Sequence, residues 1–133
     1  MAYYFSRTVE MPFDAAVRAT TEALQRHGFG VLSDLDVQAT LKNKLNVEFL
    51  PYRILGACNP QMAYRALQAE DKIGTMLPCN VIVQQHEGGR VEVAAIDPVA
   101  SMQAVQNPAL ADIAAKVREM LRQVVEEIGA AKA

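Results

Sequence analysis

Residues 79–98, with the sequence CNVIVQQHEGGRVEVAAIDP, decide the fold. Two runs of β-branched and other apolar residues flank the central pair Gly88-Gly89. Residues of this kind favour strands, and two adjacent glycines supply the positive φ angles that a two-residue type I′ turn requires. The stretch therefore predicts a β-hairpin in which Glu87 pairs with Arg90.

The predicted register brings polar residues together at the end of the hairpin far from its turn. Counting outward from the turn places Asn80 opposite Asp97, and Cys79 opposite Pro98. The segments LPCN (residues 77–80) and IDP (residues 96–98) therefore share one end of the hairpin.

The rest of the chain alternates between the periodicities of strands and helices. Strands are expected at 2–10, 29–36 and 49–58, and helices at 12–27, 36–46, 60–70 and 107–128. The last helix has the strongest pattern, with apolar residues at three- and four-residue steps that suit a helix lying across a sheet. Together with the hairpin, this order predicts an α+β fold with an antiparallel or mixed sheet and helices packed on it.

Length and charge limit the functional classes. The chain has 133 residues, enough for one domain over 1–133 with its own core. Its net charge of −2 and scattered basic residues give no electrostatic footprint for nucleic acid. The sequence shows neither a signal peptide nor an apolar run of the roughly 20 residues that span a bilayer. A cytoplasmic protein without a membrane partner is expected.

Both cysteines of the chain lie in similar short motifs. GACNP occupies residues 56–60 and LPCN residues 77–80, so each cysteine is followed by an asparagine and has a proline nearby. Asn59 followed by Pro60 predicts a helix N-cap with proline at the first helical position. If the strand that ends at Cys58 neighbours the hairpin, the two motifs and IDP converge at one rim of the sheet.

Two interpretations of this rim remain open. A thiol beside a helix N-terminus has a lowered pKa, and Asn80 and Asp97 offer hydrogen bonds, so the rim is a candidate ligand site formed by Cys58, Asn59, Cys79, Asn80 and Asp97. The alternative is structural, because cysteine is among the most buried residue types and packs as a small hydrophobe.

Several kinds of site are disfavoured by the sequence. A structural zinc site needs four Cys or His ligands at characteristic spacing. This chain has two cysteines 21 residues apart, and His27 and His86 lie elsewhere in the sequence. We therefore expect no metal site and assign no catalytic residue. No glycine-rich phosphate loop is present, and the sequence identifies no cofactor. The pair Asp34 and Asp36 is expected to end a strand and cap a helix.

The motifs GACNP, IGTMLPCNVIV and VEVAAIDP, in this order, resemble the prokaryotic family called domain of unknown function 302. The resemblance covers most of the chain. It implies a fold of β-α-β(4)-α type, similar to the TATA-binding-protein-like fold class, often as a dimer, and it implies no activity. The family pattern includes Cys58, Asn59, Pro60, Pro78, Cys79, Asp97 and Pro98.

Three functions are therefore weighed. The preferred one is a binding module for a small molecule, or one linked to thiol redox chemistry, at the Cys58/Cys79 rim. The alternatives are a dimeric interaction protein without a catalytic site and a cysteine-dependent enzyme. A homodimer is expected because the predicted register leaves apolar residues on both hairpin faces. Val81, Val83, Ala94 and Ile96 are expected on one face, and Ile82, Val91, Val93 and Ala95 on the other. The competing expectation is that the helix at 60–70 covers the second face.

Overall fold

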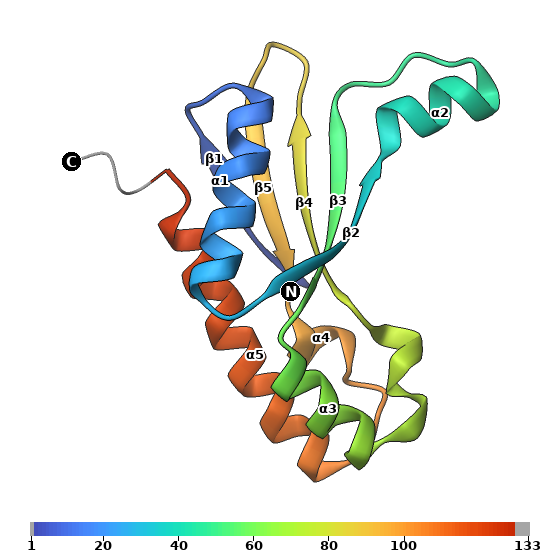
Figure 1. Cartoon of the computed structure of the whole chain (residues 1–133), viewed down its shortest axis with the longest axis vertical. Coiled ribbons are helices and arrows are strands. Elements are labelled where there is room, and N and C mark those ends of the chain that lie inside the picture. The colour runs from blue at the N-terminus through green and yellow to red at the C-terminus, as the bar shows by residue number, and fades with distance from the viewer. Residues whose placement is uncertain (1, 130–133) are drawn as a thin grey trace.

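The chain forms an open five-stranded antiparallel sheet in a computed structural model that describes residues 2–129 (Figure 1). The elements are β1 (Tyr4–Val9), α1 (Phe13–Arg26), β2 (Gly30–Asp36), α2 (Val37–Leu45), β3 (Tyr52–Cys58), α3 (Pro60–Ala69), the 3-10 helix η1 (Asp71–Met76), β4 (Cys79–Gln85), β5 (Val91–Ile96), α4 (Pro98–Ser101) and α5 (Pro108–Glu127). The strand order is β1-β5-β4-β3-β2, so β1 and β2 form the two edges. The predicted α+β class is confirmed, and α1, the four following strands and α5 give the β-α-β(4)-α pattern.

The β4–β5 hairpin is confirmed, but its predicted register is wrong by one residue. Val83 pairs with Val93, and His86 and Arg90 close a three-residue loop. The amide of Gly89 donates to the carbonyl of His86 at 3.0 Å, and Gly88 has a φ of 91°. That positive angle suits the third position of a type II turn. The loop therefore uses three residues instead of two.

This shift changes which side chains share a face of the hairpin. The buried face carries Val81, Val83, Val91, Val93 and Ala95. Ile82, Ala94 and Ile96 face the opposite side, where they are half-buried. Both faces therefore carry apolar residues, as predicted, but the predicted membership of the faces is wrong, because it assumes a loop one residue too short.

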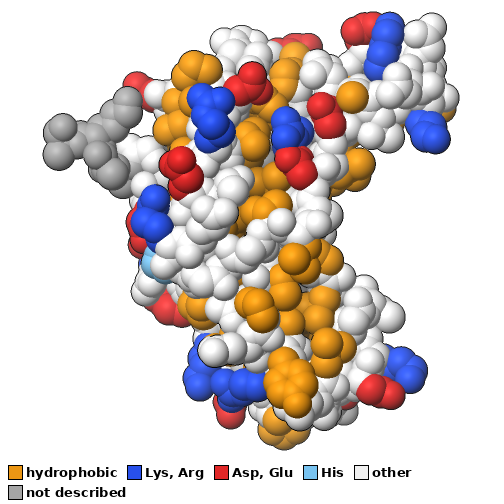
Figure 2. All heavy atoms as spheres, in the orientation of Figure 1, with side chains coloured by type: hydrophobic (Ala, Val, Ile, Leu, Met, Phe, Trp, Pro, Cys, Tyr) orange, Lys and Arg blue, Asp and Glu red, His pale blue; other side chains and the backbone are white. Residues whose placement is uncertain are grey.

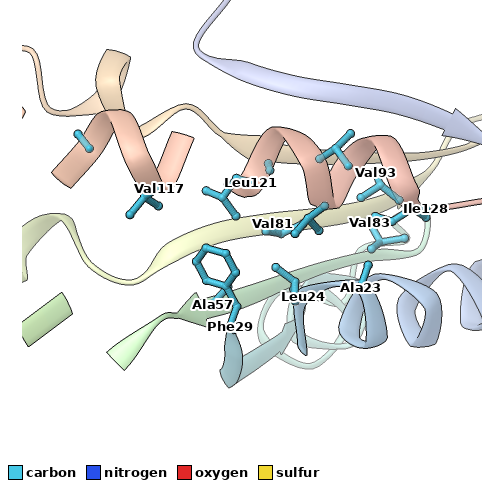
Figure 3. Close-up of a cluster of buried hydrophobic side chains, with 14 of the residues drawn as sticks. Ala23, Leu24, Phe29, Ala57, Val81, Val83, Val93, Val117, Leu121 and Ile128 are labelled. Atoms are coloured by element: carbon cyan, nitrogen blue, oxygen red, sulfur yellow. The ribbon is translucent and has the colours of Figure 1, made fainter. Parts of the chain in front are cut away.

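The buried face of the sheet packs against α1 and α5. Figure 3 shows Leu24 of α1 and Leu121 of α5 converging on Val81 and Val83 of β4. All four side chains are fully buried. The predicted role of the last helix, to close the core across the sheet, is confirmed.

Local signals in the sequence fix the ends of the helices. Asn59 caps α3 with Pro60 at the first helical position, as predicted, and Oδ1 of Asn59 accepts the amide of Met62 at 3.1 Å. Asp36 caps α2 by accepting the amide of Ala39 at 2.9 Å. Side chains of this kind satisfy amides that the first helical turn leaves without partners.

Two short elements and one projecting segment were not anticipated. η1 has six residues and precedes β4, and α4 has four residues and follows β5. The arm, defined here as residues 37–50, comprises α2 and the segment that leads to β3. It extends beyond the sheet in Figure 1, and α2 has no buried residue. Leu45, Val47, Phe49 and Leu50 are exposed on this arm.

Candidate functional site

An apolar cavity of about 300 Å³ lies at the end of the sheet where β3 ends and β4 begins. Its walls come from β2, the β3–α3 junction, α3, the η1–β4 junction, α4 and α5. The lining residues are Phe29, Leu32, Ala57, Cys58, Asn59, Met62, Ala63, Ala66, Leu67, Leu77, Pro78, Cys79, Pro98, Met102, Leu110, Ile113, Ala114 and Val117. None is charged, and apart from sulfur atoms only Asn59 contributes a polar side chain.

The cavity opens to solvent beside α3. Leu32 is 71% exposed and Leu67 is 43% exposed, although both line the cavity. Leu32 falls at the irregular step in the β2–β3 pairing between Val31 and Ser33. A bulge of this kind redirects a side chain out of its regular position. Figure 2 shows hydrophobic side chains gathered on the surface over this end of the molecule.

Gly56 allows the strands beside the cavity to approach closely. A Cβ atom on Gly56 would overlap Oγ of Ser33 and lie 2.8 Å from Cγ of Pro78. Only glycine therefore lets β2 and the LPCN segment pack against β3 in this way. This requirement gives the first residue of the GACNP motif a structural role.

The structure brings both cysteines to the cavity. Ala57 pairs with Cys79 across β3 and β4, and Cys58 is the next residue along β3. Both thiols are free and half-buried, and both line the cavity. The convergence of the two cysteine motifs, expected from the sequence, is therefore present even though the hairpin register that suggested it was displaced.

Cys79 is held as a neutral thiol. Burial raises the pKa of Cys79 to about 11, and the neighbouring Cys58 adds to the shift. A nucleophilic cysteine needs the opposite change, because the thiolate is the reactive form. The environment of Cys79 thus disfavours its use as a nucleophile at neutral pH.

Asn59 combines a cap with a place in the cavity wall. Its Oδ1 accepts the Met62 amide, while a Cβ atom built on Gly28 would lie 3.1 Å from its Nδ2. Gly28 has a φ of 84° and follows the end of α1. The Asn59 side chain is therefore engaged by the start of α3 and lies close to the turn before β2.

Asn80 and Asp97 do not line this cavity. Asn80 pairs with Gly56 on the exposed side of the sheet, opposite in direction to Cys79 and Val81. Asp97 is buried, where its Oδ1 accepts the amide of Val99 at 3.0 Å and its Oδ2 accepts Nε of Arg118 at 3.1 Å. The predicted Asn80–Asp97 pairing is wrong, because the hairpin register differs by one residue.

The two histidines are also outside the cavity. His27 follows α1 and contacts Glu127, and His86 pairs with Glu92 beside the hairpin turn at 2.8 Å. Within residues 2–129 there is no cluster of three or more His, Cys, Asp or Glu side chains placed to hold a metal ion. No helix in this part of the chain is long and apolar enough to cross a membrane.

Most of the residues that line the cavity were not predicted from the sequence. Leu110, Ile113 and Val117 of α5 and Met102 after α4 reach the cavity from segments more than 20 residues after Cys79. Their helical periodicity predicted burial but not the surface they face. The five residues predicted to form the site separate into three that line the cavity, Cys58, Asn59 and Cys79, and two that do not.

The fold and the cavity define an α+β domain with an apolar pocket at one end of an open antiparallel sheet. The chain belongs to the family described as "Domain of unknown function DUF302", which matches residues 5–128. A similar solved structure is titled "Crystal structure of uncharacterized conserved protein DUF302 from Bacillus stearothermophilus". It is 29% identical, with a TM-score of 0.89 over 96% of this chain and 99% of that chain. No curated protein matches the chain.

Proposed function

We propose that the protein binds a small apolar molecule in the cavity at the end of the sheet. The observation that carries the proposal is the uncharged wall, in which, among residues 2–129, Asn59 is the only lining residue with nitrogen or oxygen atoms in its side chain. A volume of about 300 Å³ lies at the lower end of the range for ligand pockets, roughly 300–1,000 Å³. An engineered apolar cavity of about 150 Å³ already takes up benzene.

The position of the cavity supports the same function. A bound molecule would cover the apolar surface of Leu32 and Leu67 that lines the cavity, and burial of apolar surface stabilises a complex by roughly 25 cal/mol per Å². The two free thiols suit a reducing compartment, so the proposal includes a cytoplasmic location.

An uncharged fluorescent dye tests the proposal. N-phenyl-1-naphthylamine should bind the wild-type protein saturably, with one molecule per chain. Ala63→Phe places a ring in the cavity from α3 and should weaken binding by about 10-fold or more, which corresponds to about 1.4 kcal/mol. Ala15→Phe is the control, because Ala15 is also a half-buried helical alanine but lies outside the cavity. Equal affinity in wild type and Ala63→Phe would contradict the proposal.

The second candidate is a dimeric interaction protein that uses the other face of the sheet. Among the described residues, both helices of the main core, α1 and α5, share the buried face with Val81 and Val83. The opposite face exposes Leu35 and Tyr4 and leaves Ile54, Ile82 and Ile96 half-buried. A second copy of the chain would cover this face and the adjoining apolar side chains of the arm, as two-fold dimers commonly do.

Light scattering at micromolar concentration tests the dimer. The expected mass is twice the 14.5 kDa of one chain. Leu35→Glu should give a monomer, because Leu35 is 48% exposed on the face in question and a carboxylate there would be desolvated on association. Gln25→Glu, on the exposed side of α1, should leave the mass unchanged. A wild-type mass of 14.5 kDa would end this candidate.

A further inference from the structure

Both cysteines of the chain line one uncharged cavity. Paired residues of antiparallel strands have Cα atoms about 4.5–5.5 Å apart, and consecutive Cα atoms are about 3.8 Å apart. Because Ala57 pairs with Cys79 and Cys58 follows Ala57, the Cα atoms of the two cysteines lie within about 9 Å of each other. Both side chains line the same cavity.

A third sulfur-bearing side chain lines the cavity from another element. Met102, which ends α4, is buried there. Met62 also lines the cavity, but its Sδ lies 4.0 Å from Nη1 of Arg65 and is engaged by the exposed side of α3. The cavity thus combines two thiols with two thioethers, of which that of Met102 has no competing partner of this kind among residues 2–129.

Thiolates and thioethers are soft ligands that select Cu(I) among the common biological metals. The wall has no carboxylate to hold magnesium, calcium or manganese, and two cysteines without a nearby histidine do not complete a zinc site. A soft monovalent cation needs fewer ligands than zinc, and two thiolates are enough to coordinate it. We propose that Cys58 and Cys79 bind one soft monovalent cation, chemically Cu(I) or Ag(I), with Met102 as a third ligand.

The binding step balances without any change in oxidation state. Each thiol loses its proton to solvent, and the cation forms one bond to each resulting thiolate. The complex carries a net charge of −1, and Cys58 stands directly before the N-cap of α3, where the helix dipole favours negative charge. The burial that keeps the Cys79 thiol neutral without metal makes binding depend on pH, because the cation must displace that proton.

This inference goes beyond the proposed function, because it assigns a second, different ligand to the same cavity. The test uses the reduced full-length protein without oxygen and Cu(I) supplied from the chromophoric chelator bicinchoninate. One Cu(I) per chain is expected. Cys58→Ser and Cys79→Ser should each weaken binding by at least about 100-fold, the upper end of the effect of losing an outer-shell partner. Met102→Leu should weaken it by about 10-fold.

Met120→Leu is the matched control, because Met120 is partly buried against the core but does not line the cavity. A measurement on the wild type guards against variants that fail to fold: one equivalent of Ag(I) should slow the maleimide labelling of Cys58 relative to the metal-free protein. No uptake from the chelator, unchanged affinity in both cysteine variants, or equally fast labelling of Cys58 with and without Ag(I) would overturn the inference. Dye binding in the same samples reports separately on the proposed function.

Discussion

Cys79 stabilises the fold as a neutral thiol, and its burial makes that contribution sensitive to alkaline pH. Burial raises its pKa from an ordinary value of 9.0 to about 11. A thiol with a raised pKa in the folded state contributes stability that is fully present below the ordinary value and lost as the pH rises toward the folded value. The affected window therefore runs from about pH 9 to about pH 11.

Chemical denaturation at a series of pH values measures this effect. Between about pH 8 and about pH 11, the free energy of unfolding of the wild type should fall more than that of Cys79→Ser, by on the order of 2 kcal/mol. Comparing the two proteins removes the contribution of lysines and tyrosines that titrate in the same range. Cys58→Ser should retain the fall. Parallel pH profiles for the wild type and Cys79→Ser would contradict a buried neutral thiol at this position.

At the scale of elements, the cavity depends on how closely β2, β3 and the LPCN segment approach one another. Gly56→Ala places a Cβ atom against Ser33 and 2.8 Å from Cγ of Pro78. Overpacking of this kind costs typically 1–3 kcal/mol, and we expect thermal unfolding to show a loss of about that size. Gly30→Ala is the control on β2, since a Cβ atom there meets nothing within 4 Å. Equal stability of the two variants would show that β2 and the LPCN segment can separate at no cost.

The existence of the β4–β5 hairpin was predictable from the sequence, but its register was not. Gly88 and Gly89 identified the turn correctly, but they fit a two-residue loop and a three-residue loop equally well. The runs on either side are apolar at consecutive positions, as in Val91, Val93 and Ala95 beside Ala94 and Ile96. The two registers differ in the face that carries Glu92, which pairs with Gln84 in the structure. One charged residue in a largely apolar hairpin is a weak signal, so the pattern does not choose clearly between the registers. The helix ends were predictable, because a cap such as Asn59 acts within its own turn.

At the scale of the whole molecule, the cavity results from contacts between segments far apart in the sequence. Cys58 and Cys79 were predictable as neighbours, because strand ends and their motifs are local signals. Leu110 and Val117 of α5 were predictable as buried, but their helical period does not state which wall they complete. η1 and α4 were not predicted, because helices of six and four residues lack the length over which a period can be recognised.

The central claim is that the cavity, and not the open face of the sheet, receives an apolar molecule. Methyl NMR spectra recorded during a titration with N-phenyl-1-naphthylamine test it most directly. We predict saturable shifts, at one molecule per chain, in the methyl signals of Ala57, Ala63, Leu110 and Val117, which line the cavity. The methyl signals of Ile54 and Ile82 on the open face should stay in place. Shifts confined to those two isoleucines, or no saturable shift at all, would contradict the account.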